Sequence, residues 1–135
     1  MKAENIMHAN LVTAEPEMRL YQALEIMEEK QIRHLPVVEQ GRLVGILSDR
    51  DIKKHMSASF QTKEEGTQDR LAMLKTAREV MASDPITARP ETPLKEVVQV
   101  MVDRKIGALP VVDIEGRPVG IITSIDLHRL LLERL

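Results

Sequence analysis

The sequence predicts an α+β fold made of two copies of a β-α-β-β-α unit. The first observation is a duplication, because Leu35-Pro36-Val37-Val38 recurs 74 residues later as Leu109-Pro110-Val111-Val112. Self-similarity at a fixed offset is typical of repeated structural units. The second observation is that helical apolar spacing alternates with short β-prone runs in both copies. We expect the copies at residues 1–56 and 76–135, joined by a partly helical linker at residues 57–75.

The duplication extends well beyond these segments. The offset is 74 residues upstream of the repeated prolines and 75 downstream, because one residue is added before the next glycine. A turn tolerates such an addition, whereas a slip within a strand would reverse its faces. The paired residues are Met7, Thr13, Ala14, Pro16, Glu17, Leu20, Met27, Ile32, Gly41, Arg42, Val44, Gly45, Ile46 and Asp51 with Met81, Thr87, Ala88, Pro90, Glu91, Leu94, Met101, Ile106, Gly116, Arg117, Val119, Gly120, Ile121 and Asp126.

Each repeat is expected to begin with a strand and a helix. The short β-prone runs at residues 11–13 and 85–87 predict the strands, and a proline soon follows each of them. Apolar residues then recur at i, i+3, i+4 and i+7, which predicts a helix in each repeat. These residues are Leu20, Ala23, Leu24 and Met27 in the first repeat, and Leu94, Val97, Val98 and Met101 in the second.

Each repeat then continues with a hairpin and a second helix. Residues 35–38 and 43–47 form one predicted hairpin, and residues 109–112 and 119–122 form the other, each with a glycine in its turn. The final helices are expected to begin near Ser48 and Ser124. Thr76 and Glu79 have the spacing of a capping box at the entry to the second repeat.

Composition and charge narrow the class of protein. Lys and Arg number 19 against 21 Asp and Glu, a formal net charge of −2, so no basic field would attract nucleic acid. The only aromatic residues are Tyr21 and Phe60, too few to stack successive bases. Cysteine is absent, and no apolar run approaches the ~20 residues of a membrane helix. We expect a cytoplasmic protein that binds neither nucleic acid nor membrane.

The predicted helices carry broad apolar faces. Apolar residues spread over roughly 220° of each first helix, although packing on one sheet needs only about 100°. A homodimer would cover the excess, and the alternative is that these helices lie centrally in a monomer. The residues are Leu20, Tyr21, Ala23, Leu24, Ile26 and Met27, then Leu94, Val97, Val98, Val100, Met101 and Val102, with a similar set, Ile125, Leu127, Leu130, Leu131, Leu132 and Leu135, in the last helix.

The repeats resemble a tandem pair of CBS domains, named after cystathionine β-synthase. The marks are the paired Leu-Pro-Val-Val and Val-Gly-Ile segments, and an aspartate six residues after Gly45 and after Gly120. Ile32-Arg33-His34-Leu35-Pro36 and Ser48-Asp49-Arg50-Asp51 are most similar to small bacterial CBS proteins of the acetoin-utilisation type. The resemblance implies two β-α-β-β-α repeats whose small mixed sheets pack about a pseudo-twofold axis.

The resemblance also implies adenosine-nucleotide sites in clefts between the repeats, each using a Gly-h-x-[Ser/Thr]-x-x-Asp motif. Asp51 and Asp126 can accept both hydrogens of a ribose 2′,3′-diol. The hydroxyls of Ser48 and Thr123, with the amides of the helix N-terminus, suit a phosphate. Gly45 and Gly120 would let the ligand approach the backbone. Aliphatic contacts to adenine are expected from two groups of residues: Val12, Thr13, Leu35, Pro36 and Ile46, and Ile86, Thr87, Leu109, Pro110 and Ile121.

The two motifs differ in charge. Arg33, His34 and Arg50 of the first repeat could complement a phosphate, whereas Gly107, Ala108 and Ile125 stand at the matching positions of the second. We therefore expect one site to bind better than the other. Cations of one repeat could serve a ligand held by the aspartate of the other, so the pattern leaves open which aspartate belongs to the better site. Lys53 and Lys54 are interpreted as a solvated helix face.

Each motif also has an interpretation without a ligand. Serine, threonine and aspartate near a helix start are common caps and dipole partners, which contribute about 0.5 to 2 kcal/mol. Such a cap alone would explain either copy. The two interpretations differ in whether the carboxylate is bonded to its own chain or is open to a ligand.

Metal binding and catalysis find little support in the sequence. His8, His34, His55 and His128 show no i, i+4 pairing, and no nucleophile elbow or pair of catalytic carboxylates is present. We expect a non-enzyme with no metal site and no required cofactor.

The leading hypothesis is a regulatory module that senses AMP, ADP, ATP or S-adenosylmethionine and signals to an effector protein. The alternatives are a ligand-free dimerisation or scaffold module and, more remotely, a small hydrolase.

Overall fold

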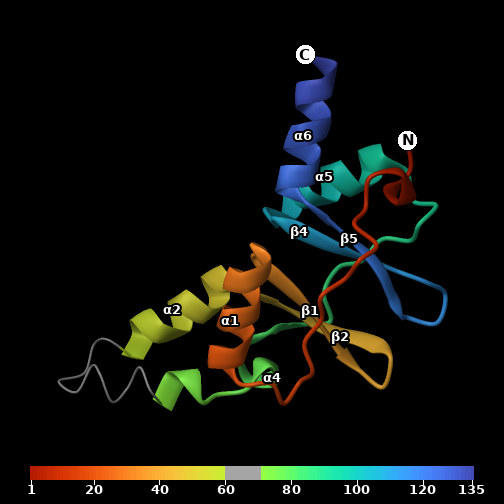
Figure 1. Ribbon diagram of the computed structural model, residues 1–135. Coiled ribbons are helices and arrows are strands. Elements are labelled where there is room, and N and C mark those ends of the chain that lie inside the picture. The colour runs from red at the N-terminus through yellow and green to blue at the C-terminus, as the bar shows by residue number, and fades with distance from the viewer. Residues whose placement is uncertain (60–70) are drawn as a thin grey trace. The chain divides into compact units, whose positions relative to one another are not determined.

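The computed structural model describes residues 1–59 and 71–135, and Figure 1 shows their helices and strands. Most of the linker predicted at residues 57–75 lies outside the described residues. In chain order the elements are a 3₁₀ helix η1 (Ala3–Asn5), α1 (Leu20–Lys30), β1 (His34–Glu39), β2 (Arg42–Ser48), α2 (Asp49–Ser59), α4 (Ala77–Val80), β3 (Ala82–Ser83), α5 (Leu94–Arg104), β4 (Ala108–Val112), β5 (Pro118–Thr123) and α6 (Ser124–Arg134).

The α+β class and the duplication are confirmed. Helices α1 and α5 coincide with the predicted helical spacing, and both end at a residue in the left-handed conformation, Gln31 with φ 54° and Lys105 with φ 55°. Helices α2 and α6 begin at Asp49 and Ser124, close to the predicted starts. The helix faces expected to be apolar supply the buried residues Leu20, Ala23, Met27, Leu94, Val97 and Met101.

Two local predictions were wrong. Residues 11–13 and 85–87 are not strands. The residue after each run makes a single parallel bridge, Ala14 to Val37 and Ala88 to Val111. The proline that follows two residues later has no amide hydrogen, so neither ladder can continue past it. The predicted capping box also fails to form, because the Thr76 side chain makes no cap hydrogen bond and its backbone pairs with Arg19.

The hairpin turns explain the extra residue of the second repeat. Gln40 and Gly41 both have positive φ, 51° and 79°, as expected in a two-residue hairpin turn. The longer turn between β4 and β5 is held by Asp113, whose Oδ1 accepts from the amides of Glu115 and Arg117 at 2.9 and 3.0 Å. The added residue is therefore confined to a turn.

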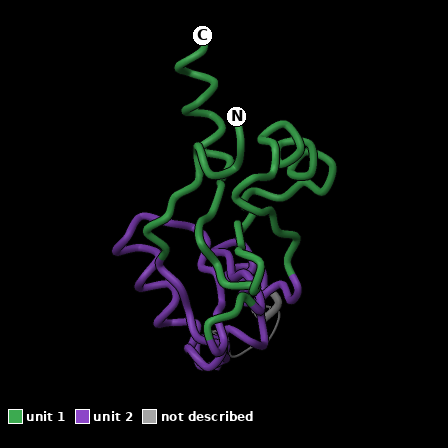
Figure 2. The backbone as a smooth tube through the Cα atoms, turned by 90° about the vertical axis from the view of Figure 1, so that its right-hand side faces the viewer, with its two compact units in different colours: residues 1–11, 41–43, 85–135 green, residues 12–40, 44–84 purple. Residues whose placement is uncertain are grey.

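The described chain divides into two compact units, coloured in Figure 2. Unit 1 contains residues 1–11, 41–43 and 85–135, and unit 2 contains residues 12–40 and 44–84. Unit 1 thus holds most of the second repeat together with the first residues of the chain. Unit 2 holds most of the first repeat together with the first residues of the second. The short segments that begin the two repeats are therefore exchanged.

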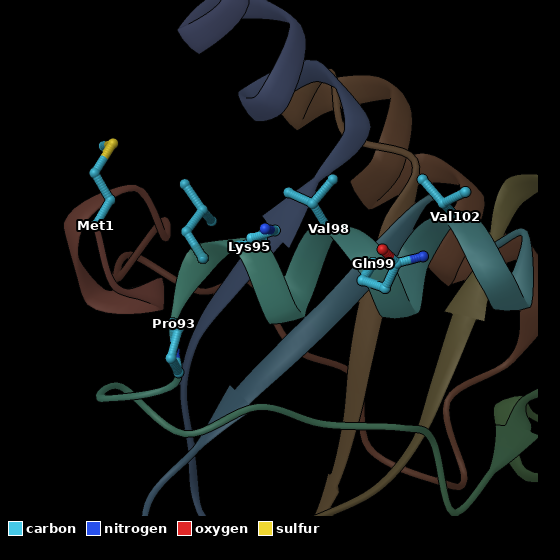
Figure 3. Close-up of a pocket in the computed structure, with 7 residues that line it drawn as sticks. Met1, Pro93, Lys95, Val98, Gln99 and Val102 are labelled. Atoms are coloured by element: carbon cyan, nitrogen blue, oxygen red, sulfur yellow. The ribbon is translucent and has the colours of Figure 1, made fainter.

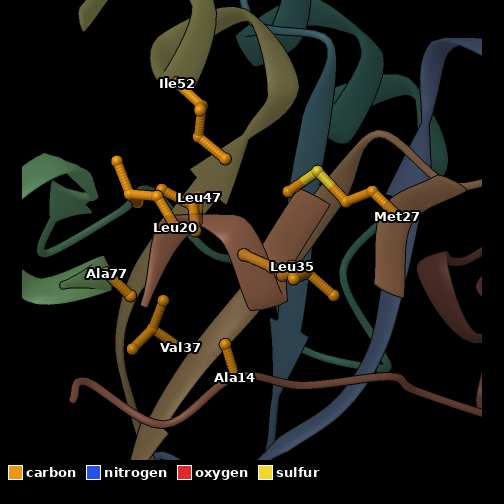
Figure 4. Packing of buried hydrophobic residues seen from close by; sticks show 9 residues of the cluster. Ala14, Leu20, Met27, Leu35, Val37, Leu47, Ile52 and Ala77 are labelled. Atoms are coloured by element: carbon orange, nitrogen blue, oxygen red, sulfur yellow. The ribbon is translucent and has the colours of Figure 1, made fainter. Parts of the chain in front are cut away.

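Each unit has its own core, and the two cores use equivalent residues. The first is drawn in Figure 4, where side chains from α1, β1, β2 and α2 converge. The buried residues of unit 2 are Ala14, Leu20, Ala23, Met27, Leu35, Val37, Leu47, Ile52 and Ala77. Those of unit 1 are Ala3, Ala88, Leu94, Val97, Met101, Leu109, Val111 and Ile122.

The exchanged segments are held by matching hydrogen bonds. In unit 2 the amide of Ala77 donates to the carbonyl of Met18 at 2.8 Å. In unit 1 the amide of Ala3 donates to the carbonyl of Thr92 at the same distance. Ala3 and Ala77 are both completely buried. Each core is therefore closed by an alanine from the segment that begins the other repeat.

The exchanged segments also fill the space beside the motif glycines. A Cβ on Gly45 would lie 2.9 Å from Met81 Cγ and 3.0 Å from the carbonyl oxygen of Ala82. A Cβ on Gly120 would lie 2.8 Å from Met7 Cγ. Both glycines therefore pack against a methionine of an exchanged segment, and their predicted role in the approach of a ligand stays a prediction.

The Gly45 contact predicts a coupled effect on stability. Gly45→Ala should lower the free energy of unfolding by about 1–3 kcal/mol, because overpacking forces Met81 or its neighbours to move. In a Met81→Ala background the added methyl group should cost clearly less. Urea unfolding of the two single variants and the double variant would measure this coupling. Strictly additive effects would contradict the contact.

Candidate functional site

The first motif lies where β2 meets α2. Ser48 ends the strand, and its Oγ accepts a hydrogen bond from the Asp51 amide at 3.0 Å. This hydroxyl therefore caps the helix, while the Asp51 carboxylate lies half-buried in the first turn. Among the residues that the structure describes, that carboxylate has no hydrogen bond or ion-pair partner. The first aspartate is thus available to an external donor.

Cationic candidates gather around this first motif. The Asp49 amide donates to the Arg33 carbonyl at 3.0 Å, which holds the start of β1 against the start of α2. Burial lowers the pKa of His34, opposed by the charges of Asp49 and Asp51 and assisted by those of Arg33 and Arg50. The charges of Asp51, Arg33 and Arg50 thus all act on His34, which lies beside the first motif. Arg33 and Arg50 are exposed.

The neighbouring lysine belongs to the helix surface. Lys53 forms an i, i+4 ion pair with Asp49 at 3.6 Å, with most of its side chain exposed. Exposed pairs of this kind contribute little to stability. The arrangement fits the solvated face expected for this part of α2.

In the second motif, the aspartate carboxylate is hydrogen-bonded to the threonine of the same motif. The Asp126 Oδ2 atom accepts from the Thr123 amide at 2.8 Å and from the Thr123 hydroxyl at 2.9 Å. Asp126 Oδ1 pairs with Nε2 of His8. Asp126 is 8% exposed, and its own amide faces Thr123 Oγ1 at 3.4 Å. The capping interpretation therefore describes this copy, with a histidine as an additional partner.

The predicted adenine contacts differ in how accessible they are. Leu35 and Leu109 are members of the two cores, and Pro36 and Pro110 are also fully buried. Their side chains support the strands. The more accessible candidates are Val12, Thr13 and Ile46 in unit 2, and Ile86 and Thr87 in unit 1, whereas Ile121 is 9% exposed.

Backbone bonds bring each predicted set together within its own unit. The Ala14 amide donates to the Pro36 carbonyl at 2.9 Å, and the Ala88 amide donates to the Pro110 carbonyl at 3.0 Å. The segments that contain Val12 and Ile86 are thereby held beside the strands that lead to the motifs.

His8 is a site residue that sequence reasoning missed. It lies 118 residues from Asp126 and has no second histidine at an i, i+4 spacing beside it. Its neighbour Met7 pairs with Met81 in the duplication, so His8 corresponds to Ala82. That correspondence was a usable signal, but its meaning depends on the segment exchange, which no local pattern reveals.

The described residues contain no group of three or more His, Cys, Asp or Glu side chains that could hold a metal ion. In the same part of the chain, no helix has the length and apolarity needed to cross a membrane.

An apolar groove of about 610 Å³ follows α5 in unit 1. Figure 3 shows Val98 and Val102 projecting from the same side of this helix, with Met1 near its start. A smaller hollow of about 180 Å³ lies between α5 and α6 and is lined by Val98, Met101, Val102, Ile106, Ser124, Leu127 and His128. No residue of the first repeat's aspartate motif lines either hollow, and Asp126 lines neither of them.

Comparison with known proteins gives the family. The model of the CBS domain matches residues 3–58 and 77–133. The crystal structure of the CBS domain pair of protein MJ0100, in complex with 5′-methylthioadenosine and S-adenosyl-L-methionine, has a TM-score of 0.86 and 31% identity. It covers 100% of this chain, which covers 98% of that chain. The predicted resemblance to a tandem CBS pair is confirmed.

Two further structures are similar over nearly the whole chain. CBSX2 of Arabidopsis thaliana in complex with AMP has a TM-score of 0.80 and 28% identity, covering 98% of this chain and 97% of that one. A protein of Vibrio cholerae that is provisionally assigned to acetoin utilization has a TM-score of 0.82 and 32% identity. The alignment covers 99% of this chain and 92% of that one.

Some curated relatives are much longer. A homoserine O-acetyltransferase of Methanohalobium evestigatum is 32% identical over 130 residues, which is 96% of this chain and 24% of the relative. The chain therefore spans about a quarter of the length of that enzyme.

The environment of His34 predicts a pH dependence of stability. Burial lowers the pKa of His34 in the folded protein from its ordinary value of 6.5. The unfolded chain therefore binds the proton more readily, so protonation of this group favours unfolding, and the free energy of unfolding decreases as the pH falls from 6.5 toward the lowered folded value. His34→Gln should make the loss of stability smaller between about pH 7.5 and pH 5. Urea unfolding across this range, with His128→Gln as an exposed control, would test the effect. An unchanged slope in His34→Gln would contradict it.

Proposed function

This chain belongs to the CBS domain family, and we propose that it is a regulatory module that binds an adenosine-containing ligand at the Asp51 motif. The observation that carries the proposal is the half-buried Asp51 carboxylate, which has no partner among the described residues. The two similar CBS pairs whose structures contain AMP or S-adenosyl-L-methionine with 5′-methylthioadenosine support an adenosine ligand.

The residues around Asp51 suit the parts of a nucleotide. Its two carboxylate oxygens can accept both ribose hydroxyls. Ser48 Oγ, which accepts from the Asp51 amide, still has its own hydrogen to donate to a phosphate. Arg33, His34 and Arg50 would surround the same phosphate, and a guanidinium can bind it with two parallel hydrogen bonds. Val12 and Ile46 would contact the adenine ring.

The proposed output is regulatory rather than catalytic, in a cytoplasmic setting. A ligand shifts a conformational equilibrium only when it binds two states with unequal affinity. The signal would therefore be a change of conformation or of association, which an effector protein would recognise by binding. AMP, ADP, ATP and S-adenosylmethionine are the candidate ligands, and the phosphate-binding residues favour a nucleotide.

A second candidate function is self-association as a dimerisation or scaffold module. Val102 is 65% exposed on α5, and Leu132 is 72% exposed on α6. The groove along α5 is lined mainly by apolar residues. Such surface is typical of protein interfaces, and two copies of this chain could cover it.

The ligand proposal predicts a difference between the two aspartates. AMP should raise the Tm of the wild-type protein, because a ligand that binds only the folded state stabilises it, by about 2.7 kcal/mol at a hundredfold excess over Kd. Asp51→Asn should weaken AMP binding at least about tenfold, since it removes a charged acceptor for the ribose. Asp126→Asn should have a much smaller effect on AMP affinity.

Calorimetric titration and thermal shift with AMP, ADP, ATP and S-adenosylmethionine would measure these effects. If none of the four ligands stabilises the wild type, the ligand proposal fails and the scaffold function is favoured. Unchanged AMP affinity in Asp51→Asn would contradict the assignment of the ligand site to the Asp51 motif.

The association proposal predicts a change of mass. Val102→Glu should convert a dimer to a monomer, because it places a charge where apolar surface is covered. Ile114→Glu is the matched control, since Ile114 is 82% exposed in the turn between β4 and β5. Sedimentation velocity would give the masses. A monomeric wild type, or a dimer that tolerates Val102→Glu, would contradict dimerisation through α5.

A further inference from the structure

The two motif aspartates are equivalent in sequence and unequal in the structure. Asp51 is half-buried and has no carboxylate partner among the described residues, whereas the Asp126 side chain is 6% exposed and has three. Thr123 supplies two of these through its amide and hydroxyl, and His8 supplies the third. The difference therefore arises both within the motif and from a residue outside it.

His8 and Ala82 occupy the same place in their respective units. His8 pairs with Ile121 through two main-chain hydrogen bonds of 2.9 and 3.0 Å. In unit 2, Ala82 pairs with Ile46, which is the residue equivalent to Ile121. Ile46 precedes Asp51 by five residues, as Ile121 precedes Asp126. The chain thus places a histidine beside Asp126, whereas the equivalent position in unit 2 is an alanine, which has no side-chain donor.

The number of hydrogen-bond donors around Asp126 explains why the histidine affects ligand binding. A carboxylate can accept about four hydrogen bonds, and a ribose diol needs two of those positions. Three are already used at Asp126, so a ligand would have to displace at least one donor. Thr123 lies in the same capping turn as Asp126, whereas His8 comes from a distant segment and its side chain is 57% exposed. The imidazole is therefore the donor that can leave without breaking the cap.

We propose that His8 acts as an intrachain occupant that withholds Asp126 from the ligand, whereas Ala82 leaves Asp51 open. This inference rests on the proposed function, because it assumes that the motif aspartates bind ribose. In this inference, the residue at one equivalent position of the exchanged segments determines whether each aspartate is open to the ligand. That position is residue 8 in unit 1 and residue 82 in unit 2. The wild-type chain would bind one nucleotide, at Asp51.

Removing the occupant should open the second site. His8→Ala keeps the main-chain pairing with Ile121, because both hydrogen bonds are made by backbone atoms. In calorimetric titrations with AMP, the stoichiometry should rise from one to two per chain. Adding Asp126→Asn to His8→Ala should return it to one. His8→Gln, whose amide can still donate to the carboxylate, should remain near one. Asn10→Ala, an exposed change in the same segment, should behave as wild type.

Adding an occupant should close the first site. Ala82→His should weaken AMP binding at Asp51 by about tenfold or more, since the ligand would then have to displace a hydrogen bond to a carboxylate. Ser83→His is the matched control, because successive residues of a strand point to opposite faces. This second variant keeps the test informative if His8→Ala lowers the stability of the chain.

The outcomes separate the two proposals. One AMP per wild-type chain, with His8→Ala still at one and Ala82→His unchanged in affinity, would overturn the role of residues 8 and 82 while the nucleotide site stands. Two AMP per wild-type chain would also overturn it. Absence of AMP binding in the wild type and in His8→Ala would instead show that the proposed function had failed.

Discussion

Each core of this protein is completed by the segment that begins the other repeat in the chain. Ala77 is fully buried in the unit that contains α1, and Ala3 is fully buried in the unit that contains α5. Both alanines are held by backbone hydrogen bonds of 2.8 Å to equivalent carbonyls. Since a buried amide must be paired, these bonds specify where the exchanged segments lie. Neither repeat as read from the sequence contains all of its own core.

This exchange links packing to ligand chemistry. It brings Met7 and Met81 against the motif glycines, which therefore cannot carry a Cβ without displacing a methionine. The residue after each methionine is then held beside the strand that leads to an aspartate. A histidine at one of these positions and an alanine at the other add to the difference that the two Thr123 hydrogen bonds already make between the duplicated motifs. In this account, the same contacts that close the cores also determine which carboxylate is open.

The sequence predicted most of what local periodicity can reveal. Apolar spacing located α1 and α5, because each helix buries one regular stripe. The duplicated glycine and aspartate located both motifs at strand-to-helix junctions. The charge difference between the repeats predicts one better binding site, which stays a prediction, and the charges of Asp51, Arg33 and Arg50 all act on His34.

The remaining features depend on contacts between distant residues. Residues 11–13 are β-prone but pair only through Ala14, since Pro16 ends the ladder. The pairing of His8 with Asp126 joins residues 118 positions apart, and no local pattern contains it. A missing Cβ can admit a ligand or another side chain, and the methionine contacts of Gly45 and Gly120 depend on the fold, so no local pattern predicts them.

A crystal structure of the wild-type chain grown with AMP would test the central claim most directly. The account predicts nucleotide density with the ribose on Asp51, and the Asp126 carboxylate still bonded to His8 and Thr123. Ribose bound to Asp126 with His8 in its present place, or nucleotide bound away from both aspartates, would contradict it.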